Sequence, residues 1–237
     1  MICIAFHFDE SRLPFLAKVL QNIAGNYKCD YGVYIDTNTT DFGKYAKEFE
    51  LAWSHKLAHP FHLTWMHREH MIEEIDNYDY FMYIEDDMLV PWENVLNYIE
   101  NFKLLWDKGF VPSFIRVEEK NGEQFVTDIT KQQKASPYAM IGGKSFIALD
   151  EPYHAFWIMP QKELKESMRK DFFRLSDSRE GAASYPMADL GRKPLVEVEI
   201  VNDKYEVSPK CHSFHISNTY VNGDSNFAKI KLENIFL

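Results

Sequence analysis

The chain has 237 residues, of which 46% are hydrophobic and 15% aromatic, so it can bury a sizeable core and is too apolar to be disordered. Its formal net charge of −10 argues against the broad basic face that nucleic acids and anionic membranes require. Its three cysteines are scattered and lack CxxC spacing, which argues against a disulfide framework or a zinc knuckle and is typical of a reducing compartment.

Predicted strands and helices alternate in the first half of the chain. Apolar runs predict strands at residues 2–8, 31–36, 61–66 and 80–84. Helices are predicted between them, beginning after Ser11, Asp41 and Arg68, and the second carries apolar residues up to Trp53. This β-α-β-α-β-α-β order is typical of a parallel sheet with right-handed crossovers. A long helix over residues 92–106 follows.

The pattern changes after residue 110. Asn121-Gly122 predicts a hairpin between strands at 112–118 and 124–129. Further strands are expected at 145–149, 155–159, 195–201 and 211–216, with a helix at 161–170, whereas residues 174–192 are irregular and polar. We therefore predict one α/β domain over residues 1–237, with functional halves at 1–110 and 111–237.

Three consecutive carboxylates, Glu85, Asp86 and Asp87, follow the apolar run at 80–84, and apolar residues resume at Met88. Adjacent carboxylates repel, and burying them unpaired is costly. A divalent cation is one way to hold them at the end of a core strand, where ligands bind in open α/β sheets. The alternative is a solvated acidic turn, and the apolar sequence on both sides argues against it.

An acid triplet at the end of the fourth strand of a Rossmann-like half resembles the D-x-D motif of GT-A glycosyltransferases, as an E-D-D variant. The resemblance covers roughly residues 1–160. It implies a GT-A fold, with a mostly parallel central sheet flanked by helices and a smaller mixed-sheet acceptor half. It also implies that Asp87 coordinates Mn²⁺ or Mg²⁺ on the donor diphosphate, while Glu85 and Asp86 face the ribose and the sugar. A hard cation that prefers carboxylate and phosphate oxygens fits this role.

The resemblance implies further donor-binding residues. It places the loop with Asp9 and Arg12 against the nucleotide base, and Asp36 on the base or the ribose. Arg68 is a candidate for the pyrophosphate, because a guanidinium can grip two phosphate oxygens. Each has a structural alternative: a solvated first-turn arginine for Arg12, a turn or cap acid for Asp36, and pairing with an acid on its own helix for Arg68.

Histidines are the other candidate metal ligands. Many GT-A enzymes draw a ligand from a late histidine, and His215 is our first choice ahead of His212. The two side chains point to opposite faces of a strand, so at most one faces the cleft, and otherwise both are structural. Five histidines between residues 55 and 70 form no evident acid–His–His set at metal spacing, and we predict no metal site there.

Transfer with inversion needs a carboxylate that takes the proton of the acceptor hydroxyl, whereas retention does not. The family often keeps an acceptor-side acid in a region such as 174–192, and there we rank Glu180 ahead of Asp177 and Asp189. Sugars stack on aromatic faces, so we expect the acceptor groove to be lined by Tyr153, His154 and Trp157. A core position is an equal alternative for Trp157.

We therefore expect a metal-dependent glycosyltransferase that moves a hexosyl or pentosyl group from a nucleotide-diphosphate sugar, with UDP as the commonest nucleotide, to a hydroxyl of a glycan acceptor. The alternatives are a non-catalytic sugar- or partner-binding module and a sugar-nucleotide pyrophosphorylase, although residues 7–10 lack the glycine-rich loop of that class. No apolar run approaches the ~18 residues of a membrane span. The first predicted strand leaves no room for a signal peptide, so we expect a cytoplasmic protein.

Overall fold

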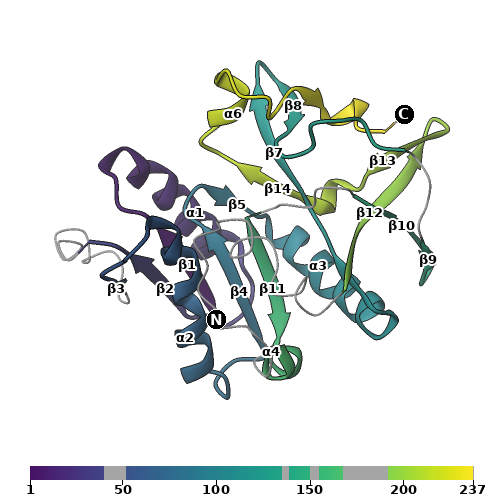
Figure 1. Cartoon of the computed structure of the whole chain (residues 1–237). Coiled ribbons are helices and arrows are strands. Elements are labelled where there is room, and N and C mark those ends of the chain that lie inside the picture. The colour runs from purple at the N-terminus through teal and green to yellow at the C-terminus, as the bar shows by residue number, and fades with distance from the viewer. Residues whose placement is uncertain (40–51, 135–138, 150–154, 168–191, 237) are drawn as a thin grey trace. The chain divides into compact units, whose positions relative to one another are not determined.

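The computed structural model describes residues 1–39, 52–134, 139–149, 155–167 and 192–236. The chain divides into two compact units (Figure 1). Unit 1 comprises residues 1–21, 28–87 and 155–190, and unit 2 comprises residues 22–27, 88–154 and 191–237. Within the described residues, no helix is both long enough and apolar enough to cross a membrane.

Unit 1 is built on a five-stranded sheet in the order β11-β4-β1-β2-β3. Neighbouring strands among β4, β1, β2 and β3 run parallel, and β11 runs antiparallel to β4. The α/β class predicted from the sequence is confirmed. The strands are β1 (Ile2–Phe6), β2 (Val33–Thr37), β3 (Ala52–Ser54), β4 (Tyr80–Glu85) and β11 (Phe156–Pro160).

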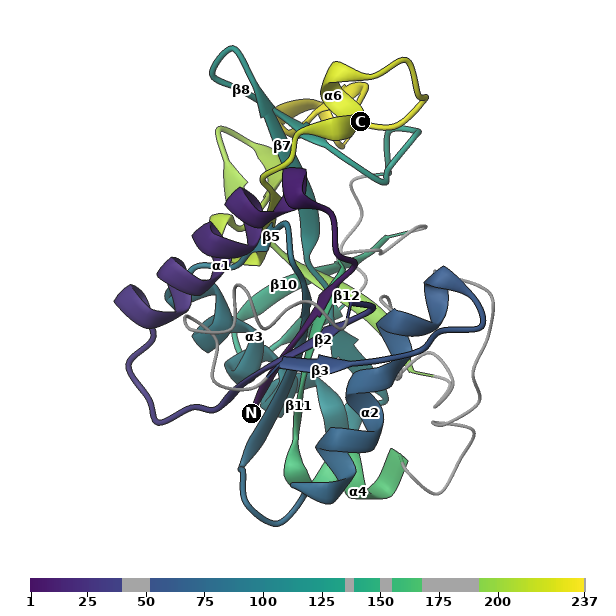
Figure 2. The same ribbon diagram turned by 90° about the vertical axis from the view of Figure 1, so that its left-hand side faces the viewer.

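Helices cover both faces of this sheet. Helix α1 (Leu13–Asn26) follows β1, and α2 (Leu63–Glu73) packs against β1, β2 and β4. The two helices lie on opposite sides of the strands (Figure 2). Because both faces are covered, every residue of β1 is buried, as expected for a central parallel strand. A short helix, α4 (Gln161–Ser167), follows β11.

The predicted third strand at 61–66 is wrong. These residues form a 3-10 turn, η4 (Pro60–His62), and the start of α2. The His59 side chain accepts a hydrogen bond from the N–H of Phe61, which fixes the start of the turn. The buried residues of α2 include two histidines and Arg68. Its inward face therefore lacks the apolar pattern from which a helix is predicted. The third strand is instead β3 (Ala52–Ser54), which includes the last residues of the predicted second helix. The earlier residues of that predicted helix, 42–51, lie outside those described.

Unit 2 contains α3 (Trp92–Leu105) and two mixed sheets. The predicted hairpin is confirmed: Asn121 and Gly122 have φ of 57° and 79°, values that asparagine and glycine adopt readily. One sheet has the order β13-β12-β10-β9, with β6 also paired to β12, and the other has the order β15-β8-β7-β14-β5. Their strands are β5 (Met88–Leu89), β6 (Phe110–Pro112), β7 (Ile115–Lys120), β8 (Glu123–Val126), β9 (Ala139–Ile141), β10 (Lys144–Ala148), β12 (Lys193–Val201), β13 (Lys204–Val207), β14 (His212–His215) and β15 (Ile230–Lys231).

Two leucines of α3 test where the core of unit 2 lies. Leu105 is fully buried and packs with Phe146 and Leu195, whereas Leu96 is 48% exposed on the same helix. We expect Leu105→Ala to lower the free energy of unfolding by about 2–5 kcal/mol, because it leaves a cavity in the core. Leu96→Ala should change it by less than about 0.5 kcal/mol. Urea denaturation measures both, and equal losses would show that this cluster is not the core.

Candidate functional site

The acid triplet is buried at the carboxyl end of β4. Glu85 is the last residue of that strand, and Asp86 and Asp87 form the turn that leads to β5. Their exposed fractions are 4%, 3% and 2%. The three carboxylates are therefore not a solvated acidic turn, and their negative charge must be compensated locally.

Arg12 provides this compensation. Its Nε donates to Asp86 Oδ2 over 2.8 Å and its Nη2 to Asp86 Oδ1 over 2.7 Å, so the pair is bidentate. The same Nη2 lies 3.1 Å from Asp87 Oδ2. The 3-10 turn η1 (Glu10–Arg12) presents this side chain, and Asp9 caps the turn by accepting hydrogen bonds from the backbone and the hydroxyl of Ser11. A guanidinium thus sits where the sequence predicts a metal cation.

One guanidinium does not balance three carboxylates. Burial raises the pKa of Asp86 to about 7, in spite of its hydrogen bonds with Arg12, and the neighbouring charge of Asp87 acts in the same direction as burial. Asp86 therefore resists ionisation, and a cation bound here would favour its ionised form.

A pocket of about 350 Å³ opens beside these acids. It lies at the carboxyl ends of the neighbouring strands β1 and β4. From β1 the chain continues to β2 and β3 on one side of the sheet, whereas β4 lies on the other side of β1. Open α/β sheets bind ligands at such a switch point. Four predicted donor-binding residues line it, namely Asp9, Arg12, Glu85 and Asp86. Ala5 on β1 and the apolar Phe61 and Leu63 complete much of its wall.

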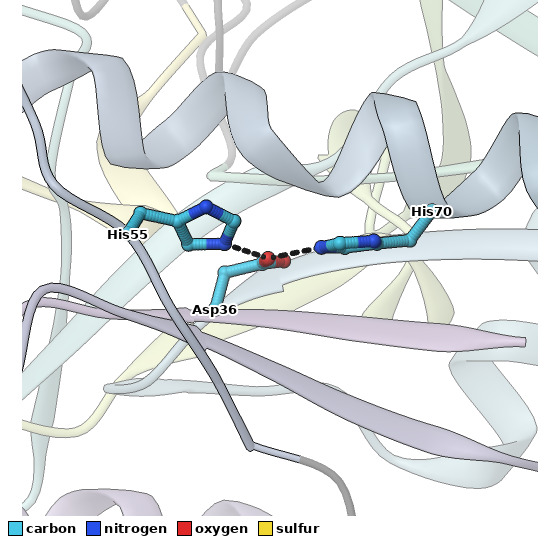
Figure 3. Close-up of side chains that lie close together, drawn as sticks. All are labelled: Asp36, His55 and His70. Carbon is cyan, nitrogen blue, oxygen red and sulfur yellow. Dashed lines mark hydrogen bonds and ion pairs between the residues drawn. The ribbon is translucent and has the colours of Figure 1, made fainter. Parts of the chain in front are cut away.

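The other two predicted donor-binding residues do not line this pocket. Asp36, on β2, is 1% exposed and its Oδ1 accepts hydrogen bonds from His55 Nε2 (2.7 Å) and His70 Nε2 (3.0 Å), as Figure 3 shows. Arg68 is 1% exposed, and its guanidinium carbon lies 4.0 Å from the centre of the Trp65 ring. Stacking on an aromatic face is a common arrangement for a buried arginine.

The sequence analysis missed His55 and His70. It found no acid–His–His set among the five histidines, yet the structure brings Asp36, His55 and His70 together with their ligand atoms all within 4.8 Å of one another. The error follows from two misassigned elements, a strand at 61–66 and a helix through Trp53. With these elements in place, the side chains of His55 and His70 are not predicted to point toward Asp36. The signal that could have found the pair is an acid near the end of one strand, Asp36, together with a histidine just past the end of the neighbouring strand, His55.

The predicted acceptor half is described only in part. Glu180, Asp177, Asp189, Tyr153 and His154 lie outside the described residues. Trp157 is fully buried in β11, where its ring packs against those of His67 and Tyr83, which agrees with a core position.

His215 and His212 lie on β14, in unit 2, and both are buried. The Nδ1 of His215 is hydrogen-bonded to Glu118, and its Nε2 lies 3.1 Å from the hydroxyl of Ser217. A carboxylate on one imidazole nitrogen fixes which nitrogen is turned outward, as in many histidine metal ligands. Burial lowers the pKa of His212 to about 4, so this imidazole is neutral at physiological pH.

Replacing Arg12 tests its role as counter-charge to the acids. We expect Arg12→Gln to lower the free energy of unfolding by about 1–3 kcal/mol near neutral pH, below the full cost for a buried pair because the side chain is 32% exposed. An acid whose pKa is raised in the folded state makes the protein less stable as the pH rises. The difference in free energy of unfolding between the parent and Arg12→Gln, measured by urea denaturation, should therefore be larger at about pH 8 than at about pH 5.

Lys165→Gln is the matched control for Arg12→Gln, since Lys165 pairs with Asp76, whose side chain is 80% exposed. Its effect should stay within about 1 kcal/mol at either pH. A deficit in Arg12→Gln that does not change with pH would contradict the role of Arg12.

Glu118 gives a second pH dependence. Burial raises its pKa, but hydrogen bonds from His215 and from the backbone N–H of Val221 outweigh burial and hold the pKa below its usual range. The resulting stability is present above the unfolded pKa and is lost as the pH falls through the folded one. We expect Glu118→Gln to be destabilised at about pH 7 and nearly equal to the parent at about pH 3, by urea denaturation. The exposed neighbour Glu119, changed to Gln, should show no such convergence.

Comparisons with known proteins add little to this geometry. No protein-family model and no curated protein matches the sequence. Among solved structures, the chain is similar to the nucleoside-diphosphate-sugar pyrophosphorylase from Vibrio cholerae RC9, with a TM-score of 0.43 and 9% identity, over 82% of this chain and 90% of that chain. A likeness of this extent does not establish a shared family, and we draw no functional conclusion from it.

Proposed function

We propose that this chain is a metal-dependent glycosyltransferase that binds a nucleotide-diphosphate sugar, with UDP as the first choice of nucleotide, in the pocket beside β1 and β4. One observation carries the proposal: a pocket at the switch point of a parallel sheet is walled by Arg12 and by buried carboxylates. Its volume of about 350 Å³ lies within the ~300–1,000 Å³ range of small-molecule sites.

The charges in the pocket suit a diphosphate bound together with a cation. Asp87, which does not itself line the pocket but adjoins the lining residue Asp86, is the proposed metal ligand. A bound Mn²⁺ or Mg²⁺ would stabilise the charge that develops on the departing nucleoside diphosphate. The cation would then take over the neutralisation of Asp86 and Asp87. Arg12, whose side chain is a third exposed, would be released to bind phosphate oxygens bidentately.

The apolar part of the wall suits the rest of the donor. Phe61 is 40% exposed at the pocket, so its ring is available for stacking against a base or a sugar. His215, in unit 2, stays a proposed metal ligand, through the nitrogen that now faces Ser217. The base that would accept the proton of the acceptor hydroxyl stays assigned to Glu180, ahead of Asp177 and Asp189.

Thermal unfolding with nucleotide sugars tests this assignment. UDP-sugars and GDP-sugars are compared in the presence of Mn²⁺. At a nucleotide-sugar concentration about 100-fold above its Kd, a ligand should raise the Tm by roughly 5–10 °C. Asp87→Ala should abolish the part of the shift that depends on Mn²⁺. The control, Asp76→Ala, removes an exposed acid of the same unit and should keep it. An Mn²⁺-dependent shift that survives in Asp87→Ala would assign the metal elsewhere.

Product analysis separates the proposed activity from its alternatives. A glycosyltransferase releases a nucleoside diphosphate from the donor, whereas a pyrophosphorylase forms a nucleoside triphosphate when pyrophosphate is added. A binding module would show the thermal shift and neither product. Release of nucleoside diphosphate that requires both Mn²⁺ and Asp87 is the expected result.

A further inference from the structure

Asp36, His55 and His70 come from three elements that meet on one face of the unit 1 sheet. In the parallel register Asp36 lies beside Trp53 of β3, and the backbone N–H of His55 donates to the carbonyl of Thr37 over 2.8 Å. That bond continues the ladder past the end of β3, so His55 faces the same side as Trp53 and Asp36. Helix α2 covers this side and supplies His70 from above (Figure 3).

The two imidazoles converge on a single oxygen. His55 Nε2 and His70 Nε2 lie 2.7 Å and 3.0 Å from Asp36 Oδ1. Among the described residues, the other oxygen, Oδ2, is buried with no hydrogen-bond partner, and so is His70 Nδ1. In the part of the chain that the structure describes, Asp36 forms ion pairs with these two histidines. Hydrogen bonding within the cluster therefore leaves a buried carboxylate half satisfied, which is unfavourable for a purely structural network.

We propose that Asp36, His55 and His70 form a binding site for a transition-metal ion, with Zn²⁺ as the best fit. Two neutral imidazoles and one carboxylate are a typical set of three protein ligands for Zn²⁺, with water as the fourth. Two nitrogen ligands distinguish this site from the all-oxygen acid triplet, which suits Mn²⁺ or Mg²⁺. The metal charge would balance the carboxylate of Asp36.

The present spacing is close to that of a metal site. Tetrahedral Zn²⁺ with bonds of about 2.0–2.1 Å places its ligand atoms roughly 3.3 Å apart. The three ligand atoms here lie within 4.8 Å of one another, so the ion needs only small side-chain movements. Each histidine must carry its proton on Nδ1 for Nε2 to bind. The His55 side chain, 15% exposed, gives the ion a way in, whereas His70 is 5% exposed.

The metal would hold one wall of the pocket. Asp36 and Glu85 both lie opposite Ala5 in the register, so the metal site is one strand away from the pocket floor. Leu63 and Thr64 of α2 line the pocket, and His70 is two turns further along the same helix from Leu63. A bond between the metal and His70 would fix α2, and with it this wall, against β2 and β3.

The test uses the full chain without a polyhistidine tag, stripped of metal with a chelator and dialysed. Titration with Zn²⁺ alone, followed by metal analysis, should give one bound ion per chain. Substitution with Co²⁺ should give the intense visible absorption of a four-coordinate site. No retained Zn²⁺, or only the weak spectrum of six-coordinate Co²⁺, would overturn the proposal.

Variants locate the ion. His55→Gln and Asp36→Asn should each weaken Zn²⁺ binding by roughly tenfold or more, because even losing an outer partner of a ligand costs 10–100-fold. The matched control is His59→Gln, which removes a half-buried imidazole four residues from His55 and should bind Zn²⁺ like the parent. Far-ultraviolet circular dichroism confirms folding, and His55, being partly exposed, is the safer change. Unchanged Zn²⁺ affinity in folded His55→Gln would refute the site.

The result is separable from the proposed function. Asp87→Ala should still bind one Zn²⁺, because the acid triplet contributes no ligand to this site. Zn²⁺ should raise the Tm of the parent and of Asp87→Ala alike, and that of His55→Gln by less at the same Zn²⁺ concentration. Loss of Zn²⁺ binding in Asp87→Ala would place the ion at the acids and contradict the proposal.

Discussion

The burial of three consecutive carboxylates at the end of β4 is the constraint on which the rest of unit 1 depends. Such a group is stable inside a protein only if positive charge is brought to it. Arg12 brings that charge from the turn after β1, and Asp9 holds the turn in place. The turn that contributes Asp9 and Arg12 to the pocket wall therefore also brings a positive charge to the acids. A ligand that changes one of these interactions must change the other.

The small side chain of Ala5 separates two polar centres. In the parallel register, Glu85 lies on one side of Ala5 and Asp36 on the other. In one centre Glu85 and Asp86 line a pocket, and the other combines an acid with two imidazoles under α2. The two proposed sites differ in ligand chemistry, so a hard and a borderline cation would bind on opposite sides of β1.

Unit 2 also buries a carboxylate, and its side-chain partner there is a histidine. Glu118 is 1% exposed and is satisfied by His215 and by two backbone N–H groups, those of Tyr220 and Val221. Hydrogen bonds to an ionised carboxylate favour its charged form and can outweigh the effect of burial. The pKa of Asp86 is nevertheless raised in spite of its hydrogen bonds with Arg12, because burial raises it most and the neighbouring charges of Asp87 and Glu85 act in the same direction.

The sequence by itself determined the α/β class, the strand that carries the acids and the hairpin at Asn121-Gly122, because these depend on local patterns: an apolar run, a charge step and a turn dipeptide. The resemblance to GT-A enzymes also placed Asp9, Arg12, Glu85 and Asp86 in one proposed site, and these four line the pocket, whereas Asp36 and Arg68 of the same set do not. Only the tertiary structure decided that Arg12 pairs with the acids and that Asp36 meets His55 and His70. Those contacts join residues 74, 19 and 34 positions apart, and the inward face of α2 is polar, so no local period reveals it.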